Sequence, residues 1–379
     1  MKRFINTNKL WFRLFSAILL GISTASCSLM DTDTSECPAG LYVNFVYDYN
    51  TQRADMFKDH VGYVTVYVFD ESDRLVMQRS AGNYGADAPL ATYGYQMHFT
   101  PEELPVGTYR LVALAMQKDW GEALATSGAK YRRTELKKGD SKSALQVTLD
   151  NTAATAEDYA STVSNAAPLD TLWYGTTGAP GQASFTTSTV TLNATGATYS
   201  TINLMRDTKT LNITIRDIDH PNTTPAEKFG ITITADNTLL DSDNELVDNG
   251  RTLYTPYAQW TTQYPETGDA EETTAHYDIN FNRLMYNNSM SYLNTSDSGA
   301  AILKLWNKEN GALIGEFNLA YLLADGRNAF ETVNYTAQGY LDREYNYNLD
   351  FVLKGDLWKY INISVGILGW AHRVENVQL

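Results

Sequence analysis

Cys27 is the residue whose neighbours most clearly predict chemistry. Thr24, Ala25 and Ser26 stand directly before it, and signal peptidase II needs small residues there because its active site is narrow. The thiol that follows such a cleavage site is the group that becomes acylated. One fatty chain binds a membrane only marginally, whereas two or more hold a protein stably. The sequence therefore predicts a mature chain that begins at Cys27 and is tethered to a membrane by acyl chains on that residue.

Residues 1–26 have the layout of a lipoprotein signal peptide. Their only charged residues are the basic Lys2, Arg3, Lys9 and Arg13, and the apolar run 14–22 is too short to span a bilayer. An ordinary signal peptide with an incidental cysteine is one alternative. An uncleaved membrane anchor is another, and the short apolar run argues against it.

Charge limits the partners of the mature chain. Removing residues 1–26 takes away four of the 29 Lys and Arg and none of the 44 Asp and Glu, which leaves a formal charge of −19. Nucleic acid is therefore not expected as a partner. Residues 27–37 form a short polar tether without a basic amphipathic helix, so membrane attachment should depend on lipid rather than on surface charge.

Cys37 is the only other cysteine of the chain. Once Cys27 is acylated, no internal disulfide can form, so stability must come from packed cores. Two roles for Cys37 stay open: a buried or inert thiol near the first strand, and an intermolecular crosslink.

A search for catalytic and metal-binding motifs predicts a protein that is not an enzyme and needs no cofactor or metal. The chain has no nucleophile elbow, phosphate-binding glycine loop, CxxC pair or HExxH, and its five histidines are scattered. The adjacent pairs Glu102-Glu103 and Glu271-Glu272 fit solvated turns better than catalysis, because neighbours on an extended chain point to opposite faces. Carboxylates brought together only by folding stay possible.

Two further patterns could bind ligands. Residues 241–245 place oxygen ligands at alternate positions as a calcium loop does, but Leu246 stands where the loop glycine belongs, so an acidic hairpin loop is favoured. The tryptophans of the mature chain could form a sugar-stacking platform, although their apolar surroundings favour core packing. They are Trp120, Trp173, Trp260, Trp306, Trp358 and Trp370.

The elements that must position these residues are mainly strands. Apolar residues alternate with period two, as in Leu41–Tyr47 and Tyr63–Phe69. Further strands are expected at Thr108–Ala115, Ala144–Leu149, Thr189–Leu192, Ile202–Leu204, Leu211–Ile215, Gly230–Thr234, Tyr277–Phe281, Ile302–Trp306, Leu313–Leu319, Tyr345–Leu353 and Ile361–Val365. Asn310-Gly311 predicts a tight primed turn, and Thr51–His60 is the best helix signal. Many short strands with abundant turn residues indicate an all-β protein of antiparallel β-sandwiches, with barrels as the alternative.

About 350 mature residues exceed what one core usually holds, so two domains are expected. Residues 150–200 are rich in Ala, Thr, Ser and Gly and are interpreted as long loops that end the first domain. The predicted organisation is a signal peptide (1–26), a lipidated tether (27–37), an N-terminal domain (38–198) and a C-terminal domain (199–379).

Seven segments together resemble the FimB/Mfa2 family of fimbrial anchor lipoproteins from Bacteroidetes. The most specific are CPAGLYVNFVYDYN (37–50) and ADMFKDHVGYVTVYVFDESDRLV (54–76). The others are LPVGTYRLVALA (104–115), LWYGTTG (172–178), INLMRDTKTLNITIRDI (202–218), YLDREYNYNLDFVL (340–353) and INISVGILGW (361–370).

The resemblance implies two tandem transthyretin-like β-sandwich domains and a structural role at the base of a fimbrium. It implies that a fimbrial stalk subunit, a fimbrillin, joins by strand complementation, in which an extended segment completes the sheet of its neighbour. Cys27 would hold the outer membrane. The acidic tether resembles surface-export signals of this phylum, which favours an outward orientation. We expect Ile361–Trp370 and Val374–Leu379 to lie at or near the subunit interface, because apolar residues alternate there at a chain end.

Two other function classes remain open from the sequence. A surface glycan-binding lipoprotein would use exposed Trp and Tyr on one sandwich face, and its support is the aromatic content. A lipid-anchored glycosidase or protease would need convergent carboxylates or a nucleophile in a cleft.

Overall fold

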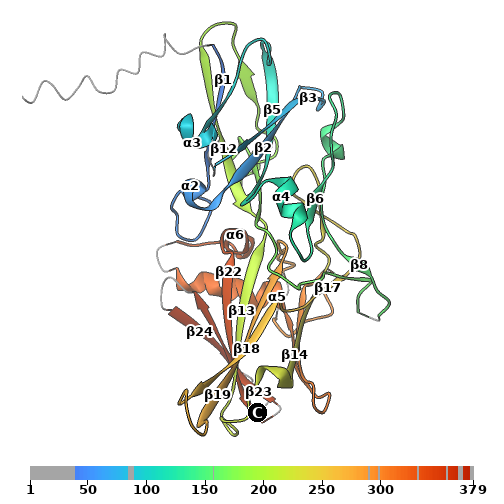
Figure 1. Ribbon diagram of the computed structural model, residues 1–379, viewed down its shortest axis with the longest axis vertical. Helices are drawn as coiled ribbons and strands as arrows, with labels where there is room; N and C mark the ends of the chain where they lie inside the picture. The colour runs from blue at the N-terminus through green and yellow to red at the C-terminus, as the bar shows by residue number, and fades with distance from the viewer. Residues whose placement is uncertain are drawn as a thin grey trace, which may run out of the picture.

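The computed structural model describes residues 39–83, 89–156, 158–288, 291–297, 299–330, 333–355, 357–365 and 370–375. Within them the protein is elongated and built mostly of strands (Figure 1), which confirms the all-β prediction. Cys27 and Cys37 lie outside the described residues, so the lipid attachment site and both roles considered for Cys37 stay predictions.

An eight-stranded sheet forms one end of the molecule. Its order is β3 (Leu75–Gly82), β2 (Tyr63–Phe69), β5 (Gly107–Met116), β10 (Leu172–Thr176), β12 (Ala197–Arg206), β1 (Gly40–Val46) and β4 (Gln96–Phe99), with β11 (Val190–Leu192) paired to β5. The sheet is covered on both faces. On β2, Val64 and Val66 pack into one core, and Tyr67 and Phe69 pack into another on the opposite face. The period-two alternation thus separates two cores.

Two six-stranded sheets share one core in the other half. The first has the order β18 (Ala258–Tyr264), β19 (Glu272–Phe281), β13 (Lys209–Asp217), β22 (Asn346–Lys354), β23 (Leu357–Val365) and β24 (Trp370–Glu375). The second has the order β21 (Leu313–Asn318), β20 (Ile302–Asn307), β14 (Phe229–Ala235), β17 (Thr252–Tyr254), β9 (Ser161–Thr162) and β8 (Thr152–Ala153). Buried side chains such as Ile213, Leu349, Ile231 and Leu303 belong to the same core.

A four-stranded sheet joins the two halves. Its order is β16 (Leu246–Val247), β15 (Leu239–Leu240), β7 (Val147–Leu149) and β6 (Tyr131–Arg133). Because β7 pairs with β15 and β9 pairs with β17, strands from both sides of residue 198 form common sheets. Residue 198 itself lies within β12, and the chain enters the next sheet between Arg206 and Lys209. The division into domains at that residue stays a prediction.

The prediction of antiparallel sheets was wrong for three strand pairs. β1 runs parallel to β12, β13 runs parallel to β22, and β9 runs parallel to β17. Parallel neighbours need a long connection, and each of these pairs joins strands far apart in the chain. Local alternation reports which residues face a core and carries no information on strand direction.

Residues 150–200 contain more structure than the predicted loops. β11 corresponds to the strand expected at Thr189–Leu192, but β8, β9 and β10 fall in this range as well, and β10 lies between β5 and β12 inside the first sheet. All five residues of β10 are buried. Small residues at its ends concealed a central strand in a segment whose composition is typical of loops.

Helices are short and cover sheet ends. They are α2 (Phe57–His60), α3 (Pro89–Thr92), α4 (Trp120–Ala125), α5 (Leu319–Ala324) and α6 (Ala337–Arg343), with 3-10 turns η2 (Lys142–Ala144), η3 (Ala226–Lys228) and η4 (Asp325–Ala329). The predicted helix over 51–60 is limited to α2. The Asn50 side chain donates to the carbonyls of Tyr47 and Ala54, and these bonds hold residues 47–54 in a turn.

The predicted hairpin exists, but its turn differs. β20 and β21 pair as expected, and Gly311 has a φ of +74°. Asn310 is absent from the described residues with positive φ, so a primed turn is wrong. The Asn310 side chain instead accepts from the Ala312 amide, and the Gly311 amide donates to the Asn307 carbonyl. These bonds form a longer loop with glycine at its single left-handed position.

Candidate functional site

Among the described residues, the acidic pairs and the acidic loop that the sequence singled out for chemistry form no common site. Glu103 pairs with Arg79 in a surface turn, and Glu272 lies opposite Tyr264 at a sheet edge. Residues 241–245 connect β15 to β16, which confirms the acidic hairpin loop. No cluster of three metal-ligating side chains occurs among the described residues.

The described tryptophans mostly follow the core-packing prediction. Trp120, Trp173 and Trp358 are buried. Trp260 is 43% exposed and stacks on His276, and Trp306 is half-buried on an outer sheet face. The side chain of Trp370 lies outside the described part of the structure.

The main polar constellation lies where the chain passes from the first sheet into the second half. Residues 206–209 make this passage between β12 and β13. Asp207 accepts from the Asn244 side chain at 2.9 Å, and Thr208 donates to the Asp170 carbonyl at 3.0 Å. Lys209 is fully buried and donates to the carbonyls of residues 342 and 344 at 2.9 and 2.8 Å.

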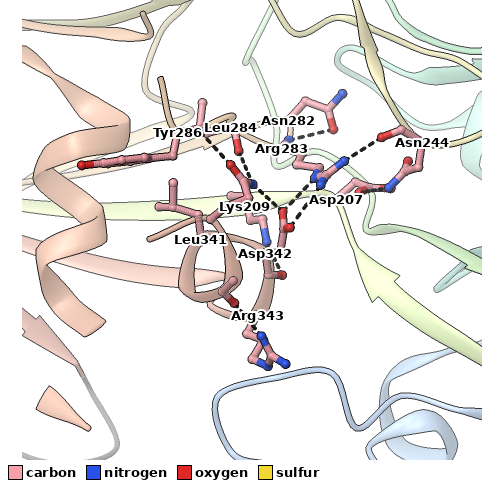
Figure 2. Close-up of polar contacts among 12 residues, drawn as sticks. Asp207, Lys209, Asn244, Asn282, Arg283, Leu284, Tyr286, Leu341, Asp342 and Arg343 are labelled. Carbon is pink, nitrogen blue, oxygen red and sulfur yellow. Dashed lines mark hydrogen bonds and ion pairs between the residues drawn. The ribbon is translucent and has the colours of Figure 1, made fainter. Parts of the chain in front are cut away.

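Residues 342–345 form the matching half of this constellation at the end of α6. Asp342 accepts from both Nε and Nη2 of Arg283, at 2.7 and 3.1 Å, and both side chains are buried (Figure 2). Arg283 also donates to the Asn244 carbonyl at 2.6 Å. A two-pronged arginine–carboxylate pair of this kind fixes distance and orientation together. We call residues 206–209, 244, 283 and 342–345 the junction.

The turn at the end of β1 docks on the same residues. The guanidinium carbon of Arg343 lies 3.8 Å from the centre of the Tyr49 ring. Thr51 donates to a carboxylate oxygen of Glu344 at 2.9 Å in a buried contact. The Tyr345 ring lies beneath Arg206, 4.2 Å from its guanidinium carbon. Segments from the start, middle and end of the chain therefore meet at the junction.

Burial shifts the titration of two junction groups in opposite directions. Burial raises the pKa of Asp207 to about 6, although Arg283 and the bond from Asn244 oppose the shift. Burial lowers the pKa of Lys209 to about 8, although Asp342 and Asp207 oppose that shift. Burial acts on Arg283 as well, but attraction to Asp342 outweighs it and raises the pKa of this residue. Both effects follow from the cost of charge in a low-dielectric interior.

The junction is built to hold segments together. Its charged groups contact one another, main-chain carbonyls, polar side chains and aromatic rings. A buried ion pair that loses one partner is strongly destabilised. Shifted pKa values occur both at functional sites and in structural ion-pair networks. The contacts of the junction are those of a structural network. RDTK (206–209) and DREY (342–345) lie within two of the segments that resemble the anchor family, but neither segment by itself predicts that the two meet.

The sheet edges are the second feature relevant to assembly. Within the described residues, β24 is the outer strand of its sheet and pairs only with β23. β18 forms the opposite edge, and six of its seven residues are exposed. An outer strand presents a row of backbone donors and acceptors to which another chain can pair. A membrane-crossing helix is not found in the described ranges: none is both long and apolar enough.

Comparisons with known proteins agree with this architecture. The family model of fimbrillin-A associated anchor proteins Mfa1 and Mfa2 matches residues 34–376. A solved protein from Bacteroides thetaiotaomicron, provisionally described as polysaccharide-binding, is 28% identical, with a TM-score of 0.66 over 89% of this chain and 99% of that one. A second from the same organism, provisionally described as an adhesin, is 26% identical with the same TM-score and the same coverage of both chains.

The fimbrial anchor protein Mfa2 from Porphyromonas gingivalis is 18% identical, with a TM-score of 0.53 over 88% of this chain and 99% of that chain. This last likeness concerns the fold alone. No curated protein sequence matches the chain.

Proposed function

Because this chain belongs to the family of fimbrillin-A associated anchor proteins Mfa1 and Mfa2, we propose that it is the structural anchor that holds a surface fimbrium to the outer membrane. The match over residues 34–376 carries the fimbrial role, and it confirms the resemblance first noted in the sequence. The finer proposal is that acylated Cys27 binds the membrane, with the body facing outward, and that a fimbrillin stalk subunit joins by strand complementation.

The order of strand pairs supports this division of work. Tension from Cys27 would enter the folded body at Gly40, the start of β1. β1 pairs along its whole length with β12, β12 leads through the junction into β13, and β13 pairs with β22. A pull along these strands loads many backbone hydrogen bonds together. The junction ties the same strands to the turn at Tyr49 and to Arg283, so it would resist separation of the two halves.

The β24 edge supports the proposed attachment of the stalk. It lies in the half of the molecule opposite the start of β1 (Figure 1), so a stalk paired there would stand away from the membrane tether. Strand addition uses backbone hydrogen bonds for affinity and alternate side chains for specificity. The opposite edge strand, β18, is the competing place for such pairing and serves as a control.

Replacement of the acylated thiol tests the tether. In the Cys27→Ala variant we expect assembled fibres in the culture medium and few on cells, because the stalk would have lost its lipid. Fibres that stay bound to cells in this variant would contradict the proposal. Fractionation and immunoblotting of cells and medium give the measurement.

Site-directed crosslinking tests the stalk edge. Glu375 on β24 and Thr262 on β18 are both exposed, so Glu375→Cys and Thr262→Cys form a matched pair in a Cys37→Ser background. With cysteines placed along the terminal segment of the fimbrillin, we expect a mixed disulfide at residue 375 and none at residue 262. Crosslinks at residue 262 alone would show that the stalk subunit attaches at β18 instead of β24. Crosslinks at neither position would oppose strand complementation.

A further inference from the structure

A large groove lies on the outer face of the second six-stranded sheet, away from the junction and from β24. Its volume is about 1140 Å³, and its floor is formed by β14, β17, β20 and β21. Sites for drug-sized ligands commonly occupy roughly 300–1,000 Å³. The groove therefore has room for an extended ligand of several rings.

Trp306 forms an aromatic platform at this groove. It lies directly opposite Gly230 in the strand register, and a side chain at position 230 would begin only 2.1 Å from the indole ring. The ring thus fills the space above a residue that has no side chain. Trp306 also borders a second hollow of about 320 Å³ lined by Pro256 and Tyr257. Its position between two hollows leaves the half-buried ring available for stacking.

The rest of the floor carries hydrogen-bonding groups of both signs. Lys304 lies opposite Glu316 across β20 and β21, with 3.3 Å between Nζ and Oε1. Arg251 donates to the hydroxyl and the carbonyl of Thr234 at 3.0 Å. Thr232 lies on the same outward face of β14 as Gly230. Asp158, Asp236 and Asp297 also line the groove, so it offers donors and acceptors together with an excess of acidic side chains.

These features favour a hydroxyl-rich, uncharged ligand over a peptide. β14 and β20 each have a paired strand on both sides, so their main chains are engaged in the sheet and cannot accept an added strand. β21 is an outer strand of this sheet, but a ligand that lies over β14 and β20, where Trp306 and Thr232 are, must bind through side chains. Sugar rings present an apolar face for stacking and hydroxyls for the charged groups, and hydrogen bonds to charged groups are the stronger ones. The chain has a net charge of −15, which disfavours polyanions.

We propose that this groove is a binding site for a neutral oligosaccharide, with Trp306 as the stacking platform and Lys304, Glu316 and Arg251 as hydrogen-bonding groups. The proposal goes beyond anchoring and does not depend on it. In a chain that anchors a fimbrium, the site would add a contact with carbohydrate close to the cell surface.

Binding to a glycan array that carries neutral, sialylated and sulfated oligosaccharides tests the proposal, with calorimetry on any neutral hit. We expect Trp306→Ala to weaken binding at least tenfold and Glu316→Gln to weaken it several-fold. Thermal unfolding should show that both variants are still folded at the temperature of the binding assay. Trp260→Ala is the matched control, because that exposed ring lies on the other sheet, and its binding should equal that of the unaltered chain.

Three outcomes would overturn the assignment. They are no neutral glycan bound by the unaltered chain, equal binding by Trp306→Ala, and equal losses in the Trp306 and Trp260 variants. Loss of stalk-subunit binding in Trp306→Ala, with no glycan bound, would assign the groove to a protein partner instead. The crosslinking at residue 375 is read independently, so failure of the glycan site and failure of the anchor function are distinguishable.

Discussion

Arg343 lies over the ring of Tyr49, with 3.8 Å between its guanidinium carbon and the ring centre. Tyr49 follows the first strand, and Arg343 ends α6 near the other end of the chain. A cation held over an aromatic ring gains about 0.5–1 kcal/mol at exposed sites and about 2 kcal/mol or more when water is excluded. The coupling free energy between these two side chains is therefore a measure of how strongly the turn after β1 is held at the junction.

A double-mutant cycle of Tyr49→Leu and Arg343→Met should give a coupling free energy of about 1 kcal/mol in urea unfolding. Lys58 and Tyr95 provide the control cycle, because Lys58 is exposed and its ammonium lies 4.6 Å from the Tyr95 ring centre. There we expect about 0.5 kcal/mol, the lower end of the range for exposed sites. Equal couplings in both cycles would show that the junction contact has no special strength.

Removal of one member of the Arg283–Asp342 pair should be costly. Arg283→Met leaves the buried Asp342 without its partner, and we expect a loss of about 3–5 kcal/mol in unfolding free energy. The double variant Arg283→Met/Asp342→Leu should be less destabilised than Arg283→Met alone, since no unpaired charge remains. Arg216→Met is the control: its pair with Asp350 spans 2.6 Å, but Arg216 is 42% exposed, and surface pairs contribute about 0–1 kcal/mol. A similar loss in both single variants would contradict the prediction.

Asp207 should make stability depend on pH in an unusual direction. Its pKa is raised to about 6 by burial, against about 3.9 in an unfolded chain. Between these pH values the folded state binds more protons than the unfolded state. The contribution of Asp207 to the free energy of unfolding is therefore fully present below about pH 4 and is lost as pH rises through about 6. Most paired carboxylates act in the opposite direction.

Comparison of the unaltered chain with Asp207→Asn isolates this effect, because the other carboxylates are common to both. As pH rises from 4 to 6.5, the difference in unfolding free energy should move in favour of the variant, by roughly 1–3 kcal/mol. Denaturant titrations at four pH values within that window are sufficient. A difference that is flat, or that moves toward the unaltered chain, would exclude a raised pKa.

Gly230 should tolerate no side chain while Trp306 is present. A Cβ in Gly230→Ala would lie 2.1 Å from the indole, and overpacking of this kind typically costs about 1–3 kcal/mol. The double variant Gly230→Ala/Trp306→Ala removes the clash, so its stability should exceed the value obtained by adding the two single effects. Thermal unfolding of the four proteins provides the cycle. Strict additivity would show that the ring moves aside at no cost.

Local pattern predicted more of the fold than of the junction. Alternation in Leu41–Tyr47 and Tyr63–Phe69 identified β1 and β2 because a half-buried strand repeats every two residues. The same criterion missed β10, since Leu172–Thr176 is buried on both faces and does not alternate. It also could not show that β1 runs parallel to β12.

The junction depended on contacts that no local pattern reports. Asp207 and Lys209 look like ordinary strand-end charges in the sequence, yet both are fully buried because strands from distant parts of the chain enclose them. The parallel pairing of β13 with β22 brings the end of α6 beside Lys209. Only then do Asp342 and Arg283 meet.

By itself the sequence indicated the strand-rich body and the resemblance to anchor proteins, and it carries the predictions of an export signal and an acidic mature chain, since each of these depends on composition, short spacing or contiguous segments. Tertiary structure alone decided that Arg343 covers Tyr49, that Arg283 pairs with Asp342, and that Trp306 lies on Gly230. These contacts depend on which strands become neighbours and in which direction they run. That choice is made by the packing of whole sheets, because the energy of a pair is gained only after the chain between its members has folded.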